Sequence, residues 1–445
     1  MGEVLIIGGG FAGLAAGVAL AKAGQRVRLL EQKPHLGGRA RSFVDPITGT
    51  VVDNGQHLLM GSYHATRRFL KEIGTLDRIR LQPHLKIQFL EPPGKLTTLD
   101  CPNLPSPWHV LGGVLRSDSF TVKEKLQIMR LGGKLRGPRA STDDLAYLTV
   151  EDWLTRMGQS EKLKRGFWDL LSIAALNEDP RRAAASIFER VLRLALFTSP
   201  EDSCLGIPRV GLSDCYVDAA REYITSRGGQ VECSRTVASL VIAEGVCRGA
   251  RLADGRAVAA DAVISAVPWV EFTRILPGEL LRLEPYFTDI LSLRPAPIIS
   301  VNLWFEKPIT DLDFVGLRGT TVQWLFNRGK VSSAAENCVS LVLSGAHSRI
   351  DYRKEDLLGL ALRDLAELFP ALHRVKVTRS LVIKERFATF SPSVGIDALR
   401  PPTQSPIRGL YLAGDWTATG LPATIEGAVR SGNSAAAEIL RSAGN

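Results

Sequence analysis

Residues 52–59, VDNGQHLL, place four polar side chains between apolar residues: Asp53, Asn54, Gln56 and His57. Histidine has an unperturbed pKa of about 6.5, so His57 could transfer a proton near neutral pH. Gln56 is the second candidate catalytic residue, and Asp53 is expected to orient the turn. The stretch could be an ordinary turn, or it could lie on a cofactor.

A glycine-rich segment near the N-terminus predicts a nucleotide-binding turn. Val4–Ile7 is a continuous apolar run, as expected for a parallel strand buried on both faces. The GGGFAG that follows has G-x-G-x-x-G spacing, which gives a tight turn, close backbone approach to a pyrophosphate, and helix–strand packing. The N-terminus of the next helix offers free N–H groups to the phosphates. The candidate binding residues are Gly8, Gly10, Phe11, Ala12 and Gly13.

A second predicted strand, RVRLLE, ends in Glu31, 18 positions after Gly13. An acid at about this separation binds the ribose hydroxyls of a dinucleotide, and it argues against the 2′-phosphate of NADP. The doublet Gly37–Gly38 follows, and then Arg39, which could neutralise a pyrophosphate oxygen that the helix leaves free. FAD and NAD share the first pattern, so the choice between them depends on the rest of the chain.

The C-terminal segment GLYLAGDWTATGLPATIEGAVRSG predicts another part of the same site. Leu410–Ala413 indicates a short strand, and a turn follows at the strand's carboxyl end, where open α/β sheets bind ligands. A helix with small residues for close packing is expected to start near Thr424. The candidate binding residues are Gly414, Asp415, Thr424, Ile425 and Ala428.

These motifs together resemble those of the amine oxidase and carotenoid desaturase superfamily of flavoproteins. The resemblance implies FAD as the cofactor, with Glu31 on the ribose, Gly38 and Arg39 at the pyrophosphate, and Asp415 on the ribityl chain. It implies that the helix near Thr424 points at the pyrimidine edge of the isoalloxazine. It also implies that Val237 contacts the adenine through its backbone, and that Gly55, Gln56 and His57 lie along the flavin.

Several longer segments resemble the hydroxysqualene dehydroxylase family over nearly the whole chain: DNGQHLL, ALNEDP, VNLWFEKP, FVGLRGTTVQWLFNRG and AGDWTATGLPATIEGAVRSG. The resemblance implies reductive removal of the hydroxyl of hydroxysqualene, a long-chain isoprenoid, to give squalene in hopanoid biosynthesis. Protonation of the hydroxyl and loss of water would leave an allylic cation that accepts hydride from reduced flavin. His57 is the expected proton donor, although it could instead only hydrogen-bond the flavin or a neighbouring carbonyl.

The expected fold is α/β with amine-oxidase-like architecture. A Rossmann-like FAD-binding domain, similar to that of glutathione reductase, is predicted from three segments: 1–75, 205–272 and 405–445. The middle segment contains short β-branched runs with a hairpin turn at Asp254–Gly255 and rejoins this domain in relatives. An inserted α+β substrate-binding domain is predicted from residues 76–204 and 273–404.

Two features of the substrate domain point to function. Residues 78–139 hold eleven bases and four acids, a net +7 of the chain's +9, interleaved with apolar side chains after Trp108. This pattern indicates a peripheral membrane contact or, equally, the charged outer face of a helix. Four aromatic residues in two strand-like runs could line an apolar pocket over the flavin or pack in the core: Trp304, Phe305, Trp324 and Phe326.

Composition sets further limits. The six cysteines are scattered without a CxxC pair, which argues against a zinc site or a disulfide framework and fits a reducing compartment. Without a signal peptide or an apolar run of about 18 residues, we expect a cytoplasmic protein at the inner face of the membrane. No nucleic-acid-binding module is visible. A second G-x-G-x-x-G is absent, so an external electron donor is expected unless the substrate itself supplies the electrons.

Two other classes of protein remain open. A carotenoid-type (phytoene or dehydrosqualene) desaturase or an amine oxidase of the same superfamily would share these motifs, which do not show the direction of electron flow. A non-catalytic protein that binds flavin or carries prenyl lipids would also share them.

Overall fold

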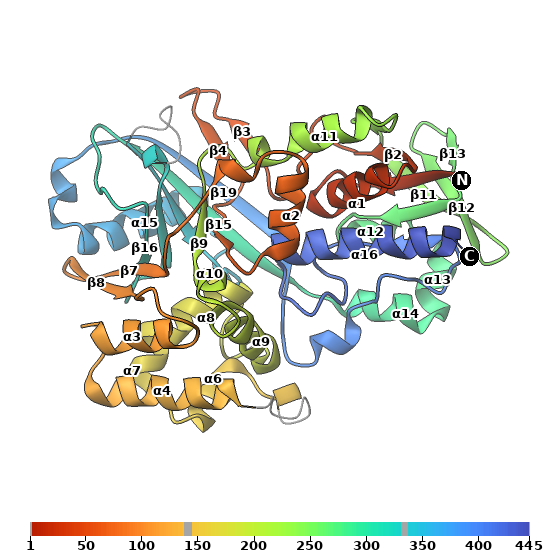
Figure 1. The fold of residues 1–445 in the computed structure, drawn as a ribbon. Helices are drawn as coiled ribbons and strands as arrows, with labels where there is room; N and C mark the ends of the chain where they lie inside the picture. Colours follow the sequence, from red (N-terminus) through yellow and green to blue (C-terminus); the bar gives the residue numbers. More distant parts are fainter. Residues whose placement is uncertain (1, 138–144, 331–336, 445) are drawn as a thin grey trace.

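A computed structural model describes residues 2–137, 145–330 and 337–444. A five-stranded parallel sheet lies on the right in Figure 1 and has the order β10–β2–β1–β14–β20. Its strands are β1 (Glu3–Ile7), β2 (Arg26–Leu30), β10 (Gln230–Glu232), β14 (Ala262–Ser265) and β20 (Leu410–Leu412). They come from the three segments predicted to bind FAD, so residues far apart in the sequence share one sheet edge.

Successive residues of β1 pack into different cores, as expected where side chains alternate along a strand. Val4 and Ile6 share a core with Leu14 of helix α1, whereas Leu5 and Ile7 share another core with Leu240 of strand β11. The helices on the first face are α1 (Phe11–Lys22), α2 (His64–Glu72), α11 (Val217–Thr225) and α16 (Ile425–Gly444). The second face packs on a three-stranded antiparallel sheet of β11 (Val237–Ala243), β12 (Val246–Leu252) and β13 (Ala257–Ala259).

A seven-stranded mixed sheet forms the centre of the remaining structure, in the order β19–β15–β18–β17–β16–β7–β8. Neighbouring strands are antiparallel, except that β16 and β7 are parallel. The strands are β7 (Lys86–Glu91), β8 (Lys95–Asp100), β15 (Pro295–Phe305), β16 (Phe314–Leu317), β17 (Trp324–Asn327), β18 (Cys338–Leu343) and β19 (Val377–Phe390). Helix α15 (Lys354–Leu368) covers one face of this sheet with an apolar core.

A group of helices, at the bottom of Figure 1, lies beside this sheet. The longer ones are α3 (Trp108–Arg116), α4 (Val122–Arg136), α6 (Val150–Arg156), α8 (Asp169–Leu176) and α9 (Ala185–Leu196). Helix α4 begins with a capping box in which the Thr121 hydroxyl and the Glu124 carboxylate exchange hydrogen bonds with backbone N–H groups. A single π-helical turn, Lys164–Trp168, leads into α8, and such turns are frequent at functional sites.

Short elements connect these parts. The strands are β3 (Ser42–Val44), β4 (Val51–Asp53), β5 (Leu59–Met60), β6 (Ile79–Leu81) and β9 (Leu205–Pro208). The helices are α7 (Glu161–Leu163), α10 (Pro200–Ser203), α12 (Trp269–Ile275), α13 (Gly278–Leu283) and α14 (Pro285–Thr288). Within the described residues, no helix is long and apolar enough to cross a membrane.

Candidate active site

One cavity of about 1230 Å³ extends from the glycine-rich turn after β1 to the helices α3, α4, α8 and α9. Of the seventeen residues predicted from the sequence to bind or act beside a cofactor, all but Gly13 line this cavity. Gly13 has another role, because a Cβ atom at this position would lie 1.9 Å from the carbonyl oxygen of Gly8. Gly13 therefore lets helix α1 start directly against the turn.

The glycine-rich turn leaves room for a ligand at the N-terminus of α1. Gly8 has a φ of +107°, which favours glycine, and Gly10 caps the helix without a side-chain hydrogen bond. A Cβ atom on Gly10 would have only the Gly38 Cα within 4 Å, at 4.0 Å. The free N–H groups of α1 thus face a space next to the Gly37–Gly38 doublet, as an anion-binding helix end requires.

Glu31 is buried at the end of β2, and its carboxylate holds the turn in place. Oε2 accepts a hydrogen bond from the Gly9 N–H at 2.8 Å, and Oε1 accepts one from the Lys33 N–H at 2.8 Å. A carboxylate has about four lone-pair sites, so it can accept further hydrogen bonds from a ribose. Val237, at the start of β11, lines the same end of the cavity.

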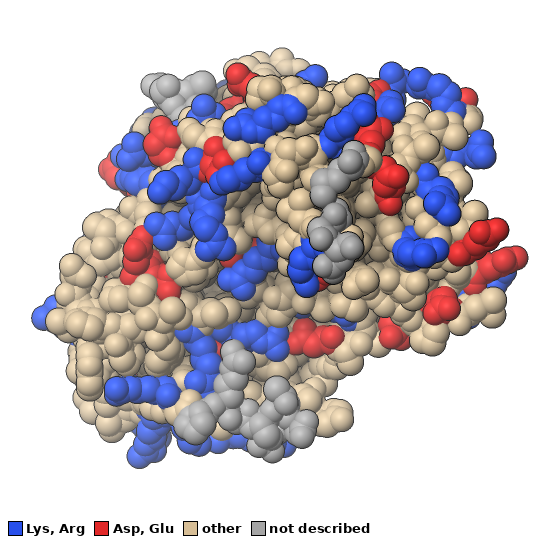
Figure 2. Space-filling view, turned by 45° about the vertical axis from the view of Figure 1, so that its right-hand side comes forward, with Lys and Arg blue, Asp and Glu red and all other residues tan. Residues whose placement is uncertain are grey.

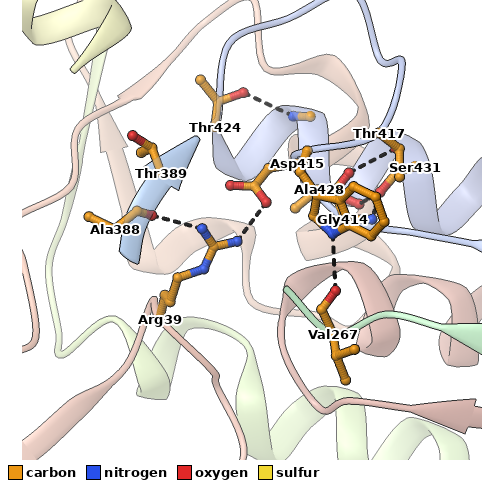
Figure 3. A network of polar contacts seen from close by, with 12 residues as sticks. Arg39, Val267, Ala388, Thr389, Gly414, Asp415, Thr417, Thr424, Ala428 and Ser431 are labelled. Atoms are coloured by element: carbon orange, nitrogen blue, oxygen red, sulfur yellow. Dashed lines mark hydrogen bonds and ion pairs between the residues drawn. The ribbon is translucent and has the colours of Figure 1, made fainter. Parts of the chain in front are cut away.

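Arg39 and Asp415 form an ion pair of 2.5 Å across the cavity wall, and Arg39 also donates to the carbonyl oxygen of Ala388 at 2.7 Å (Figure 3). Asp415 follows Gly414, whose φ of +147° disfavours other residues. The Gly414 N–H donates to the Ser431 hydroxyl of α16 at 2.7 Å, which ties this turn to the helix. The side chains predicted for the pyrophosphate and the ribityl chain are thus neighbours.

The N-terminus of α16 faces the cavity. The Thr424 hydroxyl accepts a hydrogen bond from the Gly427 N–H at 3.0 Å, and Thr424, Ile425 and Ala428 line the cavity. Glu426 also lines the cavity, and its carboxylate is engaged by the N–H groups of Ala65 and Thr66 at the start of α2. The first turn of α16 is therefore presented to the ligand with its partial positive charge.

A buried ion pair organises the segment 52–59. Asp53 and Arg328 are each less than 5% exposed, with Oδ2 of the aspartate 2.7 Å from Nη1 of the arginine. Asp53 also accepts hydrogen bonds from the Ser42 hydroxyl and the Leu212 N–H. Arg328 donates to Oε1 of Gln56 at 3.0 Å. The sequence does not point to Arg328, because its neighbours in the chain give no sign that it pairs with Asp53, 275 positions earlier.

His57 faces the cavity, with its Nδ1 atom 2.7 Å from the carbonyl oxygen of Gly55. Burial lowers the pKa of His57, against smaller opposing effects of the Gly55 carbonyl and Asp53. A carbonyl oxygen can only accept, so Nδ1 donates the hydrogen of this contact. The sequence allowed two roles for His57: the contact with a neighbouring carbonyl is present, and proton donation stays a prediction.

The four aromatic residues predicted over the flavin divide into two pairs. Trp324 and Phe326 line the cavity from β17. Trp304 and Phe305 lie at the end of β15 that is remote from the cavity, so these two follow the core-packing alternative. Trp304 packs on Val52, and Phe305 belongs to the core under α15.

Apolar side chains form the far part of the cavity. They come from the π-helical turn and from helices α3, α4, α8 and α9, and include Leu111, Met129, Phe167, Trp168, Phe188, Leu192 and Phe197. The described residues contain no group of three or more His, Cys, Asp or Glu placed to hold a metal ion. The arrangement suits a nucleotide at one end and a long apolar molecule at the other.

Comparison with known proteins identifies the family. The model of flavin-containing amine oxidoreductases matches residues 11–440. The hydroxysqualene dehydroxylase of Rhodopseudomonas palustris is 31% identical, with 98% of each chain covered, and that of Sinorhizobium fredii is 30% identical, with 98% of this chain and 97% of the relative covered. The chain belongs to the flavin-containing amine oxidoreductases, and among them to the hydroxysqualene dehydroxylase family. It is an FAD-dependent oxidoreductase.

More distant relatives of this amine oxidoreductase share the fold. The 15-cis-phytoene desaturase of Solanum lycopersicum is 26% identical over 99% of this chain and 78% of the relative. An oxidoreductase from Methanosarcina mazei superposes with a TM-score of 0.77 at 19% identity, covering 98% and 100% of the two chains. Putrescine oxidase bound to putrescine gives a TM-score of 0.72 at 16% identity, with 99% of each chain covered. The fold is thus the expected α/β one, with amine-oxidase architecture.

The residues present in this amine oxidoreductase fit FAD. Two helix N-termini, those of α1 and α16, line one cavity, and glycines leave the backbone open beside the first of them. The carboxylates of Glu31 and Asp415 also line this polar part, as acceptors for the ribose and ribityl hydroxyls of FAD. Beyond the loop 54–57, the lining consists mainly of aromatic and aliphatic side chains.

Proposed function

We propose that this enzyme removes the hydroxyl group of hydroxysqualene reductively and releases squalene and water. The observation that carries the proposal is the continuous cavity, whose polar part suits a dinucleotide and whose other part is apolar. Its volume of about 1230 Å³ exceeds the roughly 300–1,000 Å³ of common ligand pockets, in keeping with two large ligands together. The hydroxysqualene dehydroxylase relatives support the choice of substrate.

The polar part of the cavity would hold FAD, which supplies hydride when bound and reduced. Glu31 would accept hydrogen bonds from the adenosine ribose, and Val237 would contact the adenine. Arg39 and the N-terminus of α1 would meet the pyrophosphate, and Asp415 would bind the ribityl chain. Gly55, Gln56 and His57 would lie along the isoalloxazine, and Arg328 of the Asp53–Arg328 pair holds the Gln56 side chain. An external donor would reduce the flavin.

The apolar part of the cavity would serve the chemistry in two ways. It would exclude water, which would otherwise capture the allylic cation that forms when the hydroxyl leaves. Trp168, Trp324 and Phe326 line the cavity and could each stabilise a nearby cation by roughly 0.5–2 kcal/mol. The same lining would hold the C30 chain extended away from the flavin.

The direction of electron flow separates this proposal from its rivals. Reduced enzyme, kept without oxygen, is expected to be reoxidised by hydroxysqualene, with squalene as the product. In D₂O the squalene should carry one deuterium at the carbon that lost the hydroxyl, because hydride leaves an exchangeable flavin position. Mass spectrometry of the product measures both its identity as squalene and its deuterium content. A desaturase, like the phytoene desaturase relatives, would instead show the opposite electron flow: a less conjugated polyene would reduce the oxidised flavin and bleach its colour.

We also propose that helices α3 and α4 contact an anionic membrane surface, from which the substrate would enter. Five large apolar side chains of this region are 43–77% exposed: Leu104, Trp108, Leu115, Val122 and Leu126. Exposed bases lie among them, namely Arg116, Lys123, Arg130, Lys134 and Arg136. Trp108 and Arg136 also line the cavity, and the guanidinium lies 5.8 Å from the indole centroid. Figure 2 shows basic side chains along the lower edge of the molecule, the side on which α4 lies in Figure 1.

A further inference from the structure

Five carboxylates of the described residues line the cavity, and four of them are engaged by cations or backbone N–H groups. Glu31 accepts from two backbone N–H groups. Glu271, Asp415 and Glu426 pair with Arg274, Arg39 and Arg430, respectively. The fifth is Glu385, for which the described residues provide one hydrogen bond, from the Asn54 amide, and no ion pair.

Glu385 stands where the two parts of the cavity meet. It belongs to β19, and its register partner on β15 is Ile298, which also lines the cavity. Its Oε2 atom lies 3.3 Å from Nδ2 of Asn54, the residue directly before the Gly55–His57 loop. The Asn54 amide also donates to the carbonyl oxygen of Arg39 at 3.3 Å. The carboxyl group thus faces the flavin loop from the side of the substrate sheet.

The proposed reaction needs an acid at this junction. The hydroxyl must leave as water, and the Nδ1–H of His57 is already given to the Gly55 carbonyl. A group that donates this proton must lie at the junction, and neither a cation nor backbone N–H groups may hold it as an anion. Among the five cavity carboxyl groups of the described residues, Glu385 is the one placed in this way.

We propose that Glu385 donates the proton to the leaving hydroxyl, an inference that rests on the proposed function. The proton from the carboxyl group joins the hydroxyl oxygen, the carbon–oxygen bond breaks, and water leaves. Reduced FAD, when bound, would supply the hydride that the allylic carbon accepts, with loss of two electrons from the flavin. The carboxylate that remains on Glu385 lies beside the cation and stabilises it until hydride arrives, and it takes up a proton from solvent after product leaves.

The first test compares Glu385→Gln with the wild type. The amide oxygen can still accept the hydrogen bond from Asn54, but the amide cannot act as an acid. Single-turnover reoxidation of the reduced enzyme by hydroxysqualene should therefore slow by roughly 10²–10⁴-fold. Asp351→Asn is the matched control, because Asp351 pairs with the neighbouring exposed Arg386 outside the cavity. It should react at the wild-type rate. A Glu385→Gln variant that reacts at the wild-type rate overturns the inference.

The second test does not depend on turnover. The amine in which an amino group replaces the hydroxyl of hydroxysqualene carries a positive charge where the cation would form. Calorimetry on the oxidised FAD-loaded enzyme should show roughly 10- to 150-fold weaker binding of this amine to Glu385→Gln than to the wild type, because a charge-assisted contact is lost. Squalene should bind both proteins equally.

The two tests separate this inference from the proposed function. If hydroxysqualene leaves the reduced wild-type flavin unchanged, the proposed function fails, whatever the variants do. Equal affinity of the amine for the wild type and Glu385→Gln shows that the carboxyl group does not face the reacting carbon, and overturns the inference even if hydroxysqualene is the substrate.

Discussion

The two ends of the cavity are held by different kinds of interaction. At the nucleotide end, backbone groups and short-range hydrogen bonds dominate: Glu31 holds the turn at Gly9, and Ser431 holds the turn at Gly414. At the substrate end, the wall consists of apolar side chains from separate helices and strands. The proposed cofactor site therefore depends on turns that are each fixed by nearby residues and joined by the Arg39–Asp415 pair, whereas the proposed substrate pocket depends on how distant elements pack.

The ion pair of Asp53 and Arg328 joins these two ends, and its loss should have the largest effect. Arg328→Met would leave a buried carboxylate without its cation, which typically costs about 3–5 kcal/mol of unfolding free energy. Chemical denaturation measures this loss. The double variant Asp53→Asn/Arg328→Met should recover part of it, because neither partner then buries an uncompensated charge.

Lys22→Met supplies the control for this prediction, since Lys22 pairs with Glu72 at the surface. It should change the unfolding free energy by no more than about 1 kcal/mol. An Arg328→Met variant as stable as this control would show that the loop and the sheet are held together by other contacts.

The nucleotide end should respond through cofactor affinity. Glu31→Ala and Asp415→Ala each remove a charged acceptor from a sugar hydroxyl, a bond worth about 1.5–3 kcal/mol, so FAD should bind about 10- to 150-fold more weakly. Flavin fluorescence during titration of the apoprotein measures the affinity. Glu438→Ala, which removes a carboxylate paired with Arg441 near the end of α16 and outside the cavity, should leave it unchanged. Unchanged affinity in both test variants would remove these acids from the proposed site.

The difference between the two ends also explains what the sequence could predict. The turn at Gly8, the acid at Glu31 and the strand before Asp415 follow from local spacing, because a tight turn or a helix end restricts the residues next to it. The motifs also led to the correct fold family. The short strands β1, β2 and β20 lie within one residue of the positions expected for them.

Residues whose roles depend on tertiary packing were not found in this way. Arg328 and Glu385 have no local motif, and their partners Asp53 and Asn54 lie hundreds of positions earlier. The sequence left open whether Trp304 and Phe305 line a pocket or pack in the core, because strand alternation does not show which end of a long strand reaches a cavity. The contact between His57 and the Gly55 carbonyl could not be inferred from residue type alone, since it depends on how the loop folds.

The smallest expected effect concerns the outer surface of the substrate end, where α3 and α4 are proposed to contact a membrane. If α3 and α4 contact an anionic bilayer, each exposed base there contributes about 1 kcal/mol of binding, so Lys123→Gln and Arg130→Gln should each lower vesicle partitioning about fivefold at low salt. Co-sedimentation with phosphatidylserine-containing vesicles measures this, and added salt should weaken binding of the wild type. Lys354→Gln, an exposed base of α15 on the other side of the large sheet, is the control and should bind as the wild type does. Partitioning that ignores lipid charge and both substitutions would make the bases of α4 a solvated helix face, and the substrate would then have to reach the cavity by another route.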